Sequence, residues 1–193
     1  MAKSTNGPAR ESGASHFTVP GMSRESADTV IGALTERLLS LVDLSLTLKH
    51  IHWNVVGPQF IAVHEMLDPQ YQAVSAMADA TAERIATLGG SPNGLPGYLV
   101  AQRSWDDYDI GRDYAVAHLA ALDLVYCGII GSHREAIDKV GPLDPITEDL
   151  LIGQSGALEQ LHWFVRAHLE SVDGSLVNAG ADSEKAAAAS TRR

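Results

Sequence analysis

Residues 30–58, VIGALTERLLSLVDLSLTLKHIHWNVVGP, contain the pattern that decides the fold. Apolar side chains recur there in steps of 4, 4, 3, 3, 4 and 3 residues, a mean of 3.5, at Val30, Leu34, Leu38, Leu41, Leu44, Leu48 and Ile51. This period predicts one face of an α-helix rather than the alternation of a strand. A second apolar strip is formed by Leu39, Val42 and Leu46. The helix is therefore expected to be covered on two sides, by its own bundle and by something packed outside it.

Glycine and proline divide the rest of the chain into segments with the same helical pattern. They cluster at Gly57-Pro58, at residues 89–97 and at Gly141-Pro142. The clusters leave four expected helices, over residues 23–56, 58–89, 109–140 and 147–172. Four helices of this length predict an all-α, up-and-down four-helix bundle. The crossover between helices two and three is long enough for a short extra helix.

Local signals refine this outline. Pro58 suits the first turn of the second helix, Pro69 predicts a bend within it, and Thr147 is expected to cap the last helix. The bundle should span residues 23–172. Residues 1–22 and 173–193 are rich in Ala, Ser and Gly, a composition that predicts mobile tails.

Composition and charge exclude several classes of protein. The chain carries 24 acidic against 14 basic residues, a net charge of −10, which disfavours nucleic acid and anionic lipid and suits the attraction of cations. Its longest apolar run, residues 119–130, is well short of the roughly 20 residues of a membrane span. The first 16 residues have no apolar signal segment, so we expect a cytoplasmic protein. The single cysteine, Cys127, excludes disulfide frameworks, thiolate zinc sites and CxxC redox motifs, and is expected to be buried as a small apolar side chain.

No common hydrolytic or nucleotide-binding motif is present. The sequence contains no Walker loop, GxGxxG or HExxH, and Ala157 occupies the place of the second glycine in a nucleophile elbow. Two pairs of metal-ligand residues stand out instead, His64 with Asp68 and Asp79 with Glu83. Each pair is spaced i,i+4 on one helix. Such pairs are also ordinary features of a solvated helix face, which is the alternative interpretation.

The two pairs share one stripe of the second helix but cannot meet within one chain. His64 and Asp79 are about 22 Å apart along a helix that rises about 1.5 Å per residue. Residue numbers 64 and 83 have the same mean, 73.5, as 68 and 79. A two-fold axis there would place each pair beside the other pair of an antiparallel partner. Imidazole and carboxylate ligands without thiolate suit Fe(II) or Mn(II), with iron the leading candidate, and His52 is a third ligand if the Gly57-Pro58 connection folds it over His64.

The same residues resemble a known family. The string His52-Trp53-Asn54-Val55-Val56-Gly57, then Phe60, His64-Glu65, Asp68, Asp79 and Ala82-Glu83-Arg84, is similar to the ferroxidase signature of the Dps family, the dodecameric miniferritins of the DNA-protection-during-starvation type. The resemblance implies a ferritin-like four-helix subunit and a shell of twelve built from two-fold dimers. It also implies iron centres at the dimer interfaces, with up to two irons each. His52, His64 and Asp68 would come from one subunit, and Asp79 and Glu83 from the other.

The resemblance also implies a reaction. Fe(II) would be oxidised, preferably by hydrogen peroxide, and Fe(III) stored as mineral in the cavity, which protects against oxidative damage. Trp53 would take up stray oxidising equivalents, or alternatively pack at the dimer contact. Asp144, Glu148 and Asp149 stand where the family places acids lining an iron-entry pore; capping of the helix by first-turn acids is the alternative.

Two other interpretations compete. A di-iron centre within one bundle needs more than the single Glu159-x-x-His162 motif found here, and His118, His133, His162 and His168 are expected to be packed or surface histidines. A DNA-compacting protein that binds iron incidentally, and associates with the nucleoid, would use cationic tails. The candidates for DNA contact are Lys3, Arg10, Lys185, Arg192 and Arg193. So few cations predict weak, salt-labile DNA binding or none.

Overall fold

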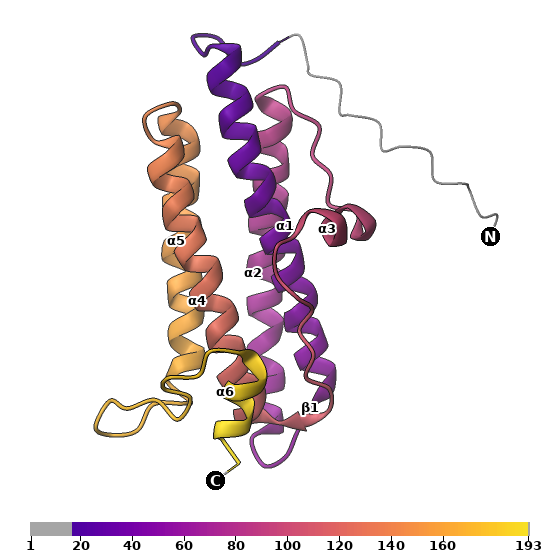
Figure 1. Ribbon diagram of the computed structural model, residues 1–193, viewed down its shortest axis with the longest axis vertical. Coiled ribbons are helices and arrows are strands. Elements are labelled where there is room, and N and C mark those ends of the chain that lie inside the picture. The colour runs from indigo at the N-terminus through magenta and orange to yellow at the C-terminus, as the bar shows by residue number, and fades with distance from the viewer. Residues whose placement is uncertain (1–16, 193) are drawn as a thin grey trace, which may run out of the picture.

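The computed structural model describes residues 17–192. Over that range the chain forms six helices and two short strands (Figure 1). In chain order they are α1 (Arg24–Asn54), β1 (Val55–Val56), α2 (Phe60–Thr87), α3 (Pro96–Gln102), β2 (Asp113–Tyr114), α4 (Ala115–Val140), α5 (Pro145–Arg166) and α6 (Glu184–Ser190). The predicted all-α four-helix bundle is confirmed, with α3 as the extra helix in the crossover.

The direction of the helices differs from a simple up-and-down bundle. After α2 the crossover returns along α1 to the end where α2 began (Figure 1). There β2 pairs in parallel with β1, Val55 opposite Asp113 and Val56 opposite Tyr114. Because α2 and α4 both start from this end, they run in the same direction. One long crossover of this kind is typical of ferritin-like bundles.

The ends of the helices explain most of the boundary differences. Helix α5 begins at Pro145, because the Asp144 side chain, not Thr147, caps it by accepting from the Ile146 N–H. Helix α2 begins two residues after Pro58 and continues through Pro69. Helix α4 begins only at residue 115, since the two residues before it belong to β2.

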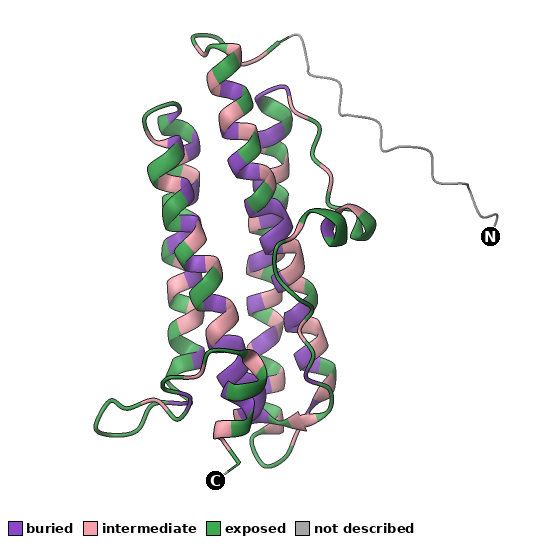
Figure 2. Cartoon of the chain, in the orientation of Figure 1, coloured by how far each residue is buried: buried purple, intermediate pink, exposed green. Residues whose placement is uncertain are grey.

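The predicted apolar face of α1 lies in the core. All seven residues of the first strip are at most 3% exposed, and fully burying one such side chain contributes about 1.5–3 kcal/mol. Figure 2 shows this buried face running along the bundle interior. The second strip is covered only in part. Asp43 holds the crossover by accepting from Arg103 and Trp105, at 3.2 and 2.9 Å, whereas Leu46 remains 56% exposed.

Among the described residues, α4 is the one helix whose length and composition alone would suit a membrane span. However, 56% of its most apolar window is buried in the subunit, so its apolar character is that of a core helix.

The C-terminal segment differs from the expected tail. Residues 173–192 carry helix α6, whose Ala188 packs with Ala117 and Ala121 of α4. Before it, Asn178 is only 3% exposed and donates to the carbonyl of Ala120 at 3.1 Å. Alanine-rich composition suggested a tail because it offers little apolar area. The same small side chains let α6 approach α4 closely. The tail expected at residues 1–22 lies mostly outside the described residues.

Candidate metal centre

Two histidines at one end of the bundle are locked together by their backbones. The Nδ1–H of His52, in the last turn of α1, donates to the carbonyl of His64, in the first turns of α2, at 3.0 Å. The Nδ1–H of His64 donates in return to the carbonyl of His52, also at 3.0 Å. Their rings stack with centroids 3.6 Å apart. Because a carbonyl only accepts, each Nδ1 carries the proton and each Nε2 keeps a lone pair for a metal.

The connection through Gly57 produces this arrangement, which meets the condition set for His52 as a third ligand. Gly57 has φ +99°, and a Cβ there would lie 2.6 Å from the Tyr114 ring. A residue with a side chain would be strained at this φ and would also collide with that ring. The tight turn therefore folds the end of α1 back over the start of α2.

Asp68 lies one helical turn beyond His64, and its carboxylate faces the same histidines. One oxygen is 3.5 Å from His52 Nδ1 and 2.6 Å from Lys49 Nζ. The hydrogen bond and the positive charge of Lys49 lower the pKa of Asp68, although desolvation opposes them. Lys49 also lies over the Tyr71 ring, 5.0 Å from its centroid. Lys49 could not be predicted as a neighbour of Asp68, because a separation of 19 residues gives no sign of a contact.

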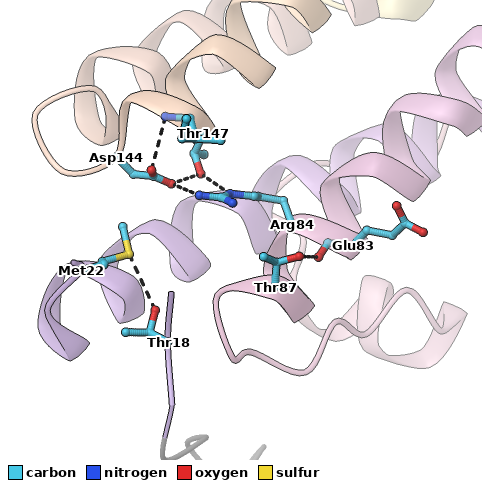
Figure 3. Close-up of polar contacts among 8 residues, drawn as sticks. Thr18, Met22, Glu83, Arg84, Thr87, Asp144 and Thr147 are labelled. Carbon is cyan, nitrogen blue, oxygen red and sulfur yellow. Dashed lines mark hydrogen bonds and ion pairs between the residues drawn. The ribbon is translucent and has the colours of Figure 1, made fainter. Parts of the chain in front are cut away.

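Asp79 and Glu83 lie farther along the same uninterrupted helix and are both exposed. In Figure 3 the Glu83 carboxylate points away from the neighbouring Arg84 and Asp144. With about 22 Å of helix between His64 and Asp79, one subunit cannot gather all five predicted ligands. Each subunit instead presents two separate candidate half-sites, one of two imidazoles with a carboxylate and one of two carboxylates. This donor set suits a hard or borderline divalent cation such as Fe(II).

The predicted pore residues occupy three different environments. Asp144 is 5% exposed and accepts from Arg84 Nη2 at 2.6 Å and from the Thr147 hydroxyl (Figure 3). Burial raises the pKa of Asp144, but these hydrogen bonds outweigh it and the pKa is lowered. Since this carboxylate is enclosed within the subunit, Asp144 is a helix cap rather than a pore group. Glu148 is half-buried and Asp149 exposed.

Asp149 and Glu83 share one shallow hollow. It has a volume of about 380 Å³ and lies between α2 and α5. Its lining residues are Ala80, Glu83, Arg84, Thr87, Ile146, Asp149 and Leu150. The predicted pore group is therefore near the carboxylate half-site.

The remaining predicted residues lie in different surroundings. Trp53, beside His52, is 72% exposed, which suits either role assigned to it. Glu159 accepts from Arg134 at 3.0 Å, whereas His162 contacts Asp123 at 2.7 Å, so the two side chains of Glu159-x-x-His162 do not share one site. His118 and His133 are fully buried, as expected for packed histidines.

The cations considered for DNA contact are partly neutralised. Lys185 pairs with Asp109 at 2.5 Å, and Arg192 pairs with Asp113. Lys3, Arg10 and Arg193 lie outside the described residues.

Comparison with known proteins agrees with this geometry. Residues 31–174 match the family model of the ferritin-like domain. The DNA protection during starvation protein of Mycolicibacterium smegmatis is 55% identical over 92% of this chain and 97% of its own length. Among solved structures, DpsA14 from Streptomyces coelicolor is 60% identical, with a TM-score of 0.84 over 86% of this chain and 99% of its own. An archaeal Dps homologue from Halobacterium salinarum is 30% identical, with a TM-score of 0.77 over 92% and 99%. On this fold, this pair of half-sites and these relatives, the chain belongs to the Dps family of ferritin-like proteins.

Proposed function

We propose that this chain is a ferroxidase and iron-storage protein, with iron centres completed between two subunits. The observation that carries the proposal is the reciprocal pair of histidine–carbonyl hydrogen bonds, which leaves the Nε2 lone pair of each imidazole free to bind a metal, with the Asp68 carboxylate close to His52. A partner subunit would supply Asp79 and Glu83, which are exposed on the same helix. The shared midpoint of the two pairs lets one two-fold axis create two equivalent centres.

The residues of the centre have separable tasks. The carboxylates of Asp68, Asp79 and Glu83 bind Fe(II) as hard oxygen ligands, and His52 and His64 bind it through Nε2. Lys49 pairs with Asp68, with Nζ 2.6 Å from a carboxylate oxygen. Iron binding at that oxygen would compete with Lys49, because two positive charges close to one carboxylate oxygen repel each other.

Hydrogen peroxide is the proposed oxidant. Two Fe(II) ions give two electrons to one peroxide, which takes up two protons and leaves as two water molecules, while two Fe(III) ions form. Up to two irons in one centre allow this two-electron step without release of hydroxyl radical. Trp53, exposed next to His52, is placed to take up an oxidising equivalent that escapes.

Storage follows from assembly. We propose a shell of twelve subunits in the cytoplasm, with Fe(III) mineral inside and entry pores lined by Glu148 and Asp149. The net charge of −10 on each subunit favours the attraction of Fe(II). The internal pairing of Lys185 and Arg192 supports weak DNA binding or none. Gel shifts at about 50 and about 200 mM salt test this, and a complex that survives the higher salt would contradict it.

Co-assembly of two inactive variants tests the shared centre directly. One variant carries His52→Ala and His64→Ala, and the other carries Asp79→Ala and Glu83→Ala. Each alone should lose most of its peroxide-driven Fe(II) oxidation, measured by stopped flow after anaerobic loading. In a mixed dimer, one of the two centres has all five ligands.

Refolding the two variants together at equal ratio should therefore restore about one quarter of the wild-type rate, if dimers form at random. A His168→Ala protein is the matched control for removal of an exposed histidine away from the centre, and should keep the wild-type rate. Absence of rescue, or full activity of either variant alone, would refute the shared centre. Comparison of peroxide with air in the wild type tests the choice of oxidant.

A further inference from the structure

A second group of metal-ligand side chains lies on the other helix pair. Asp123 and Cys127 are one turn apart on α4, and His162 reaches them from α5. His162 Nε2 is 2.7 Å from Asp123 Oδ1 and 3.8 Å from Cys127 Sγ. The three donor atoms all lie within 4.8 Å of one another. Cys127 is exposed, contrary to the expectation that it is buried.

The carboxylate and the imidazole are held from behind. Asn178, from the C-terminal segment, donates to the second oxygen of Asp123 at 2.8 Å. The Tyr126 ring stacks near the His162 ring, with centroids 5.8 Å apart. Both side chains are largely buried, at 6% exposed for Asp123 and 12% for His162. Only the thiol is open to solvent, which leaves an approach for an ion and for a water molecule as a fourth ligand.

We propose that Asp123, Cys127 and His162 bind one Zn²⁺ per subunit, with solvent at the fourth position. Tetrahedral zinc with bonds of about 2.0–2.3 Å holds its donor atoms roughly 3.3–3.6 Å apart. The present N–S distance of 3.8 Å is already close to this value. The N–O distance must open from its present 2.7 Å, because the proton between His162 and Asp123 is exchanged for the ion.

The donor set separates this ion from iron. One thiolate with an imidazole favours zinc, whereas the half-sites of α2 offer only imidazole and carboxylate. The exclusion of thiolate zinc sites on the single cysteine was too broad: it holds for sites with several cysteines, but not for one thiolate with two other ligands and an open position.

The surroundings of the thiol oppose metal binding in part, because the thiol must lose its proton to become a ligand. Burial and the Asp123 carboxylate raise the pKa of the Cys127 thiol, against the opposing effect of Arg166. A thiol protonated at neutral pH is a poor nucleophile towards peroxide. Binding of Zn²⁺ would release that proton, and the positive charge of Arg166 would offset part of the affinity.

The competing explanation is structural: the Asp123–His162 hydrogen bond would simply hold the C-terminal segment through Asn178. Cobalt distinguishes the two, because Co²⁺ bound by a thiolate shows intense near-ultraviolet charge-transfer absorption. We expect the metal-stripped full-length protein to develop this absorption with a break at about one equivalent per subunit. Added Zn²⁺ should then remove it.

Cys127→Ala should abolish the charge-transfer absorption, and His162→Gln should weaken cobalt binding. His64→Ala, which alters only the proposed iron centre, should keep the absorption unchanged, so failure of this proposal and failure of the ferroxidase proposal are distinguishable. No thiolate absorption in the wild type, or equal absorption in Cys127→Ala, would overturn the zinc site.

A thermal readout covers the case in which variants fold differently. Zn²⁺ should raise the Tm of the wild type, because an ion bound only to the folded state stabilises it. It should raise the Tm of Cys127→Ala by less, because only the proposed iron centre remains to bind Zn²⁺, and the metal-free Tm of this variant should match that of the wild type because the thiol is exposed. Equal Zn²⁺-dependent shifts in the two proteins would contradict the site.

Discussion

The two ends of α2 hold an aspartate next to a cation in opposite ways. At the first end Asp68 pairs with Lys49, and the two side chains are 46% and 26% exposed. At the other end Asp144 pairs with Arg84, and they are only 7% and 15% exposed. An exposed pair made by a flexible lysine exchanges readily with an incoming ion. A buried pair made by a planar guanidinium, with Thr147 as a further donor, is a fixed part of the fold. The contrast shows that an acid–base pair alone does not indicate function.

The largest effect on stability is expected from the removal of Arg84. Arg84→Met should lower the free energy of unfolding by about 3 kcal/mol, because Asp144 would stay buried with its charge unpaired. Urea unfolding at fixed subunit concentration measures the loss. Arg134→Met is the matched control: its pair with Glu159 is exposed at 65% and 42%, so the loss should stay below about 1 kcal/mol. Equal losses in the two variants would contradict the assignment of Asp144 as a buried structural group.

The geometry of the exposed end depends on Gly57. Gly57→Ala should cost about 1–3 kcal/mol, because alanine is strained at φ +99° and its Cβ meets the Tyr114 ring. Fe(II) oxidation should fall as well, since the turn positions His52 over His64. Gly32→Ala is the control within α1, where a new Cβ has open space, and it should stabilise the helix by about 0.5–1 kcal/mol. A Gly57→Ala protein with wild-type stability and activity would show that the turn is not required.

Replacement of Lys49 tests the more exposed pair through its effect on Fe(II) binding. Lys49→Met should tighten Fe(II) binding severalfold, because the cation that competes for Asp68 is gone. The midpoint of unfolding should not change, since the pair is exposed. Anaerobic Fe(II) titration and urea unfolding on the same preparation measure both quantities. Weaker Fe(II) binding would instead identify Lys49 as a positioning residue of the centre.

The smallest expected effect concerns Glu184, a half-buried carboxylate at the start of α6. Burial, with the charges of Asp43 and Asp106, raises the pKa of Glu184 from 4.5 to about 7. Glu184 therefore binds its proton more tightly when the C-terminal segment is docked on the bundle than when it is free. Docking of this segment weakens as the pH rises from about 4.5 to about 7. Amide exchange over α6 should accordingly be faster at about pH 8 than at about pH 5, after correction for intrinsic rates. Glu184→Gln should remove this excess, and an unchanged pH dependence in that variant would assign it to another group.

Much of the fold follows from local sequence signals. The 3.5-residue period of residues 30–51, the Gly57-Pro58 turn and the glycine and proline clusters located the helices. The i,i+4 pairs supplied the side chains of the proposed metal centre. The parallel course of α2 and α4 could not be predicted this way, because periodicity carries no direction. The docked C-terminal segment was missed for a related reason, since alanine contributes through close approach rather than through apolar area.

Contacts between distant residues account for the remaining differences. Asp144 precedes an acidic first turn, a pattern shared by a cap and a pore, and only Arg84, 60 residues earlier, decides between them. Cys127 and His162 are 35 residues apart and come together through the packing of α4 against α5. No spacing along the chain encodes either contact.

The reciprocal histidine–carbonyl hydrogen bonds between α1 and α2 affect when a subunit in the cell can begin to oxidise iron. They form entirely within one subunit, so the imidazole half of a centre is rigid as soon as the monomer folds and no ordering cost is left for iron. If the partner supplies the other half, a centre becomes active only when two subunits assemble. A newly made, unassembled subunit would then stay inert towards ferrous ion, and ferric product would arise only where a shell exists to hold it.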